Sequence, residues 1–149
     1  KVGIPDSILL KQAGLSDGEY AVMQTHTVLG FEILSASKSG LLQLAAEIAA
    51  SHHERWDGQG YPNRLSGDAI PLSGRIVTIA DIYDALTSAR PYKDAWPHAT
   101  AVDYIKDNAG KNFDPKCVEA FVRAEPQVLA IAQEHGSERN ALQWAREVA

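Results

Sequence analysis

The sequence predicts an all-α protein that folds as a compact helical bundle. Apolar residues recur at helical spacing along most of the 149 residues, and no useful length of chain alternates as a strand would. Glycine and proline interrupt the pattern mainly between residues 55 and 72, and no internal repeat occurs. A chain of this length fits one domain, so we expect residues 1–149 to form a single unit.

The first long helix is expected to run from Ser16 to about Leu34. Ser16 and Glu19 form a capping-box motif at its start, and His26 falls on its apolar face. A second helix is expected over about residues 40–54. The inward face of the first helix is expected to comprise Val22, Met23, Leu29, Gly30 and Ile33.

The segment from Ser73 to about Thr87 is apolar on almost every side, which is typical of a central, buried helix. Two shorter helices are expected to begin at Pro97 and Pro115, because proline suits the first helical position. Residues 126–149 also have a helical pattern, with polar content rising toward the end. The loop over residues 55–72 is long for a compact domain, and such loops are usually functional.

Composition excludes several classes of protein. The chain is 45% hydrophobic and 22% charged, as ordinary globular proteins are. A net charge of −5 without a basic tract argues against nucleic-acid binding. The longest apolar stretch, residues 41–50, contains Gln43 and Glu47, so we expect no membrane span. A lone Cys117 fits a reducing compartment, so we expect a cytoplasmic protein.

Histidines and a mid-helix acid are the candidates for a metal site. His52 and His53 are adjacent, and neighbouring helical positions diverge by about 100°, which suits two metal ions better than one shared ion. A single core histidine is usually only hydrogen-bonded, but His26 with this pair indicates a common partner. Asp81 lies inside the most apolar helix, where an unpaired carboxylate is costly. We therefore expect Asp81 to meet a metal or, alternatively, a salt-bridge partner.

Other polar residues leave two interpretations open. Arg90 and Lys93 follow the apolar helix and suit either a phosphate clamp or a solvated helix exit. Tyr61 suits either packing of the loop or stacking on a base. His98 and His135 have polar neighbours in the sequence, so we expect both at the surface.

The sequence resembles the HD-GYP subfamily of HD-domain metal-dependent phosphohydrolases, bacterial enzymes that hydrolyse cyclic di-GMP. The likeness covers about residues 1–124 and leaves 125–149 as a C-terminal helical extension. Arg64 stands where the family commonly has glycine. The motifs that carry the likeness, in order, are the stretch from His52 to Pro62, Ile70-Pro71-Leu72, Ala80-Asp81, the stretch from Asp84 to Ser88, Arg90-Pro91-Tyr92-Lys93 and Phe113-Asp114-Pro115.

The resemblance implies two or more divalent transition metals, with iron or manganese favoured. Lys1 corresponds to the lysine three residues after the family's His-Asp pair, so we expect the chain to be truncated just after that pair. Metal binding and activity are then expected to be weak in this chain alone. The roles implied are metal ligation by His26, His52, His53 and Asp81, substrate binding by Tyr61, Arg90 and Lys93, and a catalytic contribution from Lys1.

The function implied is a metal-dependent cyclic di-GMP phosphodiesterase, the catalytic part of a bacterial signalling regulator. The expected binding partner is then a cyclic dinucleotide, and we expect the protein to bind neither nucleic acid nor a membrane. The alternative is a catalytically degenerate module that binds another protein through the Gly-Tyr-Pro loop. Truncation would also uncover apolar stripes around His26 and Ile48, so we expect self-association or a rearranged N-terminal segment.

Overall fold

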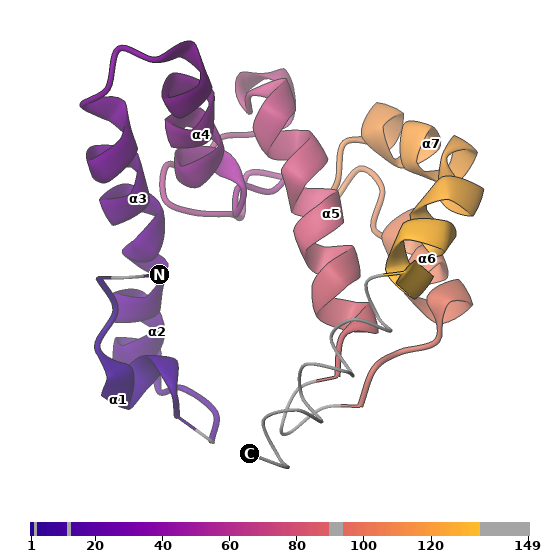
Figure 1. Cartoon of the computed structure of the whole chain (residues 1–149), viewed down its shortest axis with the longest axis horizontal. Coiled ribbons are helices and arrows are strands. Elements are labelled where there is room, and N and C mark those ends of the chain that lie inside the picture. Colours follow the sequence, from indigo (N-terminus) through magenta and orange to yellow (C-terminus); the bar gives the residue numbers. More distant parts are fainter. Residues whose placement is uncertain (2, 12, 90–93, 135–149) are drawn as a thin grey trace.

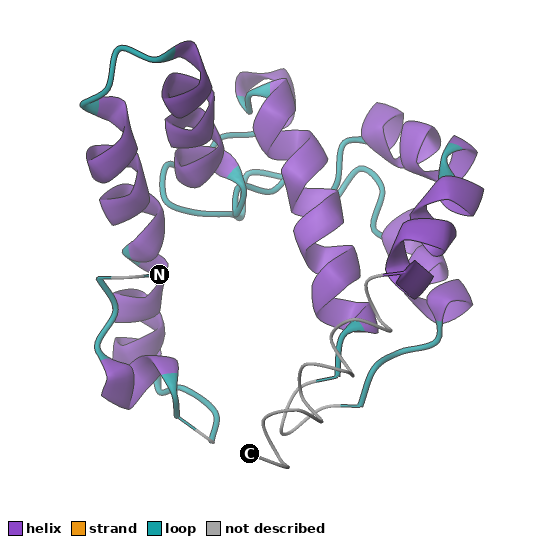
Figure 2. Cartoon of the chain, viewed as in Figure 1, coloured by secondary structure: helices purple, strands orange, loops and turns teal. Residues whose placement is uncertain are grey.

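The computed structural model describes residues 1, 3–11, 13–89 and 94–134, and the described residues form helices and loops without a named strand (Figures 1 and 2). This confirms the all-α prediction. Residues 125–134 are helical as well. The elements are α1 (Asp6–Leu9), α2 (Asp17–Gln24), α3 (His26–Ser35), α4 (Gly40–Ser51), the 3-10 turn η1 (Gly67–Ala69), α5 (Leu72–Thr87), α6 (His98–Asp107) and α7 (Pro115–Arg123).

The helices pack largely in series along the chain. Helix α3 packs on α4, α4 packs on α5, and α5 contacts both α6 and α7 (Figure 1). The main hydrophobic core therefore lies in the C-terminal half, on one side of α5. Its buried members are Ile79, Tyr83, Leu86, Ala101, Val102, Ile105, Phe113 and Val118.

The N-terminal half buries its apolar residues less well than the sequence predicts. Val22 is 38% exposed and Ile33 is 68% exposed, although both were expected to face inward. Helix α5 is also not buried all round, because Ile76 is 53% exposed. In the N-terminal half the contacts run from α1 to α2, from α2 to α3 and from α3 to α4, which leaves Val22 and Ile33 exposed. Within the described residues, no helix has both the length and the apolarity needed to cross a bilayer.

The long helix expected over residues 16–34 is divided at Thr25. The Thr25 hydroxyl donates to the Val22 carbonyl oxygen at 2.7 Å, and the Thr25 backbone N–H bonds the same oxygen at 3.1 Å. The His26 ring donates to the Met23 carbonyl at 2.7 Å. Side chains that bond nearby carbonyls compete with the helical ladder. The helix therefore breaks where the first candidate ligand begins α3.

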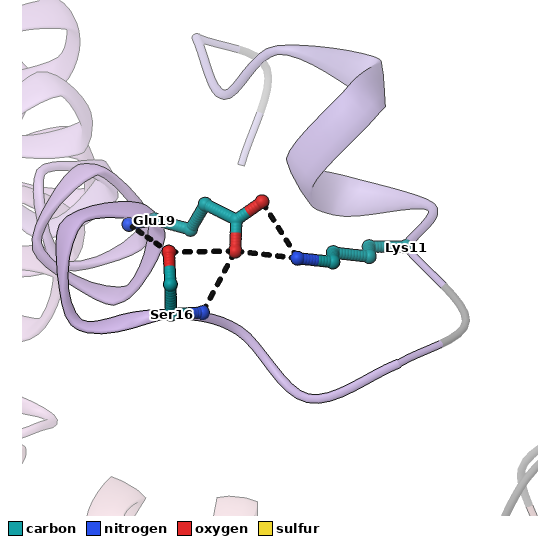
Figure 3. Close-up of polar contacts among 3 residues, drawn as sticks. All are labelled: Lys11, Ser16 and Glu19. Atoms are coloured by element: carbon teal, nitrogen blue, oxygen red, sulfur yellow. Dashed lines mark hydrogen bonds and ion pairs between the residues drawn. The ribbon is translucent and has the colours of Figure 1, made fainter.

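Two predicted helix starts are confirmed at their caps. The Ser16 hydroxyl accepts from the Glu19 backbone N–H, and the Glu19 carboxylate accepts from the Ser16 N–H at 2.7 Å (Figure 3). Asp114 caps α7 by accepting from the Lys116 N–H at 2.8 Å. Helix α6 begins one residue later than predicted, with Pro97 at the cap position.

A close contact between α4 and α5 fixes the end of α4. Gly74 is buried, and a Cβ there would meet Ser51 Oγ and would lie 2.8 Å from Ser51 Cβ. One turn later, the Thr78 hydroxyl donates to the His52 carbonyl oxygen at 2.8 Å. The absence of a side chain at Gly74 thus lets α5 approach the chain just before the histidine pair.

The Lys11–Glu19 pair should make stability depend on acid pH. The Lys11 ammonium, 2.6 Å from the carboxylate, and the Ser16 bonds lower the pKa of Glu19 from 4.5 to about 2 (Figure 3). Because the folded pKa is the lower one, this contribution is complete above pH 4.5 and is lost as the pH falls toward 2. Proton titration by NMR should show Glu19 as a low-pKa carboxyl. Lys11→Met should move its pKa back toward 4.5, and an unchanged pKa would contradict the ion pair.

Gly74→Ala should destabilise the fold. Alanine normally favours a helix over glycine by about 1 kcal/mol, but here the new methyl overlaps Ser51, and overpacking costs about 1–3 kcal/mol. Gly18→Ala in α2 is the matched control, because nothing lies within 4 Å of its added Cβ and a gain in stability is expected. Urea unfolding of both variants measures the difference. A Gly74→Ala protein as stable as the Gly18→Ala protein would contradict the close α4–α5 contact.

Candidate metal centre

Three histidines meet where α3 begins and α4 ends. One ring nitrogen each from His26, His52 and His53 can be chosen so that all three lie within 4.8 Å of one another. The His52 and His53 ring centroids are 4.1 Å apart, and those of His26 and His53 are 5.0 Å apart. The structure therefore brings together the three histidines that the sequence singles out.

Backbone carbonyls determine which ring nitrogens face each other. A carbonyl oxygen can only accept, so the His26 Nδ1 bonded to the Met23 carbonyl at 2.7 Å must carry a proton. The same holds for His52 Nδ1, which lies 3.0 Å from the Ile48 carbonyl oxygen. Each neutral imidazole then presents an unprotonated Nε2, and the two Nε2 atoms are 3.3 Å apart. Two lone pairs face each other across this gap.

A cation between the two nitrogens would remove the repulsion between their lone pairs. Two nitrogens bound at about 2.1 Å to one tetrahedral ion lie about 3.4 Å apart, close to the observed separation. A shared proton is the other solution; burial, ahead of the nearby positive charges, lowers the pKa of His26 and so disfavours the proton on that ring. The donor set and its spacing therefore fit a divalent metal.

The rings of the adjacent histidines lie closer together than helical spacing predicts, and the number of ions they bind stays a prediction. His52 is the C-terminal cap of α4 and His53 lies in the following turn, outside regular helix. Their rings are inclined by only 39° and lie on the same side. Leaving the helix removes the 100° divergence, so a single ion can reach nitrogens from both rings.

His53 is held neutral by its surroundings. Burial, followed by the neighbouring His52 and His26 and by Lys1, lowers its pKa to about 3. One face of the ring stacks on Tyr61, with the centroids 4.7 Å apart and the planes inclined by 27°. A neutral imidazole is the form that binds metals, so His53 is ready to do so at neutral pH.

Asp81 does not lie in the buried setting that the sequence predicts. It is exposed, because it falls on the face of α5 opposite the buried Ile79 and Tyr83. Its charge nevertheless reaches the Tyr61 hydroxyl: burial, then Tyr20 and then Asp81 raise the pKa of that group. Asp81 therefore lies on the side of α5 toward the Gly-Tyr-Pro loop, but outside the tight group of three histidines.

Of three further predicted site residues, the structure describes one and leaves two outside the described residues. Lys1 is exposed, and its charge contributes to the lowered pKa values of His26 and His53, so its ammonium lies near the cluster. Arg90 and Lys93 lie outside the described residues, as does His135.

His98 is less exposed than expected, because its side chain is 20% exposed and both ring nitrogens have partners. Its Nδ1 accepts from the Tyr83 hydroxyl at 2.7 Å, and its Nε2 lies 3.2 Å from a Glu125 carboxylate oxygen. The two partners come from α5 and from the helical residues after α7. Neither is near His98 in sequence, so the local pattern could not reveal them.

A buried carboxylate that sequence reasoning missed holds the loop over the site. Glu54 is 1% exposed, and its two oxygens accept the backbone N–H groups of Asn63 at 2.7 Å and Leu65 at 2.9 Å. In the sequence, the signal for this role was an acidic residue directly after the two histidines. Its two hydrogen bonds with backbone N–H groups could not be predicted, because they form only when the loop is folded. Glu54 thereby closes the loop that carries Tyr61 and the cis peptide to Pro62.

This loop and the helices enclose a cavity of about 910 Å³ beside the histidines. His52, His53 and Tyr61 line it, so a substrate in the cavity would touch the candidate metal ligands. The rest of the lining includes Tyr20, Gln24, Arg55, Gln59, Arg64 and Asn112. Tyrosine rings, amides and arginines are suited to a ligand that has both aromatic and anionic parts.

Comparison with known proteins agrees with this site. Residues 1–117 match the HD domain family. The chain is 50% identical over 131 residues to the cyclic di-GMP phosphodiesterase response regulator RpfG of Xanthomonas campestris, covering 88% of this chain and 35% of that protein. It is 51% identical over 131 residues to the 3'3'-cGAMP-specific phosphodiesterase 2 of Vibrio cholerae, covering 88% of this chain and 25% of that protein.

Among solved structures, a cyclic GMP-AMP specific phosphodiesterase of Vibrio cholerae shares the fold. The TM-score is 0.56 at 24% identity, over 83% of this chain and 31% of that chain. The chain spans about a third or less of the length of the curated relatives just described. The match over residues 1–117 and the motifs from His52 to Pro62 together confirm the resemblance, and the chain belongs to the HD domain family, as a member of its HD-GYP type.

Proposed function

We propose that this chain is the catalytic part of a metal-dependent phosphodiesterase that hydrolyses cyclic di-GMP. The observation that carries the proposal is the geometry of His26 and His52: their Nδ1 atoms face backbone carbonyls, and their Nε2 atoms lie 3.3 Å apart beside a cavity that His52 lines. The names of relatives such as RpfG support the same reaction. A bacterial signalling regulator acting in the cytoplasm is the setting that this activity suggests.

The proposed metal ligands are His26, His52, His53 and Asp81, and the metals are iron or manganese. Mixed imidazole and carboxylate ligands suit both ions. Divalent ions held there would polarise the phosphodiester and activate a water molecule for attack on phosphorus. Exposed Asp81 lies toward the Tyr61 side of the site, where its carboxylate would add negative charge to three neutral imidazoles.

The substrate is proposed to bind in the cavity along the Gly-Tyr-Pro loop. Tyr61 lines the cavity and rests on His53, which positions its ring next to the proposed ligands. Lys1 lies close enough to the histidines to balance negative charge that develops on a phosphate there. Arg90 and Lys93 are proposed to bind the substrate phosphates, since an arginine fork and a lysine point charge both suit phosphate oxygens.

A second substrate is favoured by one specific observation. The chain is 51% identical to a Vibrio cholerae protein named as specific for 3'3'-cGAMP. Both candidates are cyclic dinucleotides that contain guanine, so the site chemistry described above serves either. Turnover of the two compounds by the same preparation separates them.

His52→Ala should lower metal loading and turnover together. Removing one of two facing nitrogens should weaken metal binding by at least about ten-fold, since changes to groups that only support metal ligands already cost this much. His98→Asn, a histidine bonded to Tyr83 and Glu125 instead, is the control and should keep its metal. Elemental analysis and cyclic di-GMP hydrolysis, on wild type and on both variants, give the result.

Metal bound equally by His52→Ala and wild type would contradict the assigned centre. Wild-type protein that takes up neither manganese nor iron even at a large excess of the metal, and hydrolyses no cyclic dinucleotide, would favour the protein-binding alternative. In that case the Gly-Tyr-Pro loop would act as a docking surface only.

We also propose that this chain self-associates in solution. Large apolar side chains on α3 and α4 are exposed, with Leu41 at 75%, Ile33 at 68% and Leu44 at 47%. Contiguous exposure of this kind favours association. Light scattering should give a mass above 16.2 kDa, and Ile33→Lys should lower it. A monomer at concentrations of about 100 μM would contradict the proposal, because even a complex with a Kd of about 1 μM is largely formed at that concentration.

A further inference from the structure

Arg64 combines an unfavourable backbone conformation with a position in the cavity wall. Its φ is +55°, and it is the one described residue other than glycine with positive φ. Side chains with a Cβ rarely adopt this left-handed region, and arginine has no local hydrogen bond to offset the strain as asparagine does. Strained backbone of this kind tends to occur at functional positions.

The backbone itself explains the conformation at this position. Glu54 accepts the N–H groups of Asn63 and Leu65, the residues on either side of Arg64. Holding both neighbours on one buried carboxylate forces the chain to turn sharply at Arg64. Glycine would make that turn without strain. The turn therefore accounts for the positive φ, but not for the arginine.

The position of the Arg64 side chain offers a reason for an arginine at this turn. Arg64 is exposed and lines the same cavity as His52 and His53. Within the described part of the chain it makes no ion pair and no side-chain hydrogen bond. Arg55, the other arginine in the lining, is already bonded to Asp57 at 2.6 Å. Arg64 is thus the described lining arginine whose guanidinium remains available for a ligand.

The neighbouring lining groups favour a base over a phosphate as that ligand. Tyr61, Gln59 and Asn112 share the cavity wall and supply aromatic and amide groups. Under the proposed function, the phosphates of the substrate bind at the histidine centre. Its bases are then expected to contact the other residues that line the cavity. An arginine fork matches the O6 and N7 acceptors of guanine, whereas adenine presents an amino donor in place of O6.

We propose that Arg64 is a specificity-determining residue, which donates its guanidinium fork to O6 and N7 of a guanine of the cyclic dinucleotide. This inference rests on the proposed function, because it assumes that a cyclic dinucleotide occupies the cavity. It assigns a preference for guanine over adenine to one side chain, and it gives a reason for an arginine at a turn that glycine would make without strain.

Equilibrium binding to metal-free protein tests the proposal without turnover. Titration calorimetry should show that Arg64→Gly weakens binding of cyclic di-GMP by about ten-fold or more, the loss expected for one bidentate contact. Binding of cyclic di-AMP should change by less than about two-fold, because the guanidinium that the substitution removes is proposed to bond guanine and not adenine. Arg64→Ala should lose the same affinity, and Arg64→Lys should lose part of it, because it keeps the charge without the fork.

Stability supplies the second readout. Arg64→Gly should melt at a higher temperature than wild type, whereas Arg64→Ala should not, because only glycine relieves the positive φ. Asn63→Ala is the matched control on the same loop and should bind cyclic di-GMP as wild type does. Unchanged cyclic di-GMP affinity in Arg64→Gly would overturn the inference, as would an equal loss for both dinucleotides. Failure of manganese-loaded wild type to bind or hydrolyse any cyclic dinucleotide would overturn the proposed function instead.

Discussion

The site depends on two imidazoles whose protons are already engaged. His26 and His52 each donate Nδ1–H to a carbonyl of their own helical segment, so each must aim a bare Nε2 at the other. Imidazoles placed in this way cost stability unless a cation joins them, and that cost is recovered when a metal binds. The fold thus prepares the ligands before the ion arrives.

The scaffold around this pair holds the histidine segment from several directions. Gly74 lets α5 approach Ser51, and the Thr78 hydroxyl bonds the His52 carbonyl. Glu54 folds the following loop back over the cavity through two backbone bonds. Further along, the Trp56 N–H bonds the Asn112 carbonyl at 3.2 Å and ties the loop to the segment between α6 and α7. The ligands therefore rest on backbone contacts rather than on the main hydrophobic core.

Sequence periodicity predicted the helices well because apolar spacing reports local geometry. Helix α5 was expected over residues 73–87 and runs over Leu72–Thr87, and the caps at Ser16 and Asp114 are where the motifs place them. The division at Thr25 was missed because side-chain bonds to nearby carbonyls leave no periodic signal.

Features that depend on contacts between distant segments could not be predicted in this way. Asp81 was expected to be buried because its helix is apolar, but packing of α6 and α7 on only one side leaves it exposed. His98 was expected at the surface, yet its two ring nitrogens contact Tyr83 and Glu125. The histidine cluster was anticipated, whereas the direction of each ring nitrogen depends on carbonyls that only the folded helices position.

The tautomers of His26 and His52 test the central claim most directly. Nitrogen-15 NMR of the imidazoles, in chelator-treated protein at neutral pH, should show protonated Nδ1 and unprotonated Nε2 in both rings. Stoichiometric Zn²⁺, used as a diamagnetic probe, should shift both Nε2 resonances together and leave both Nδ1 protons in place. A proton on Nε2 of either ring in the metal-free protein, or Nε2 resonances that do not respond to the metal, would contradict the account.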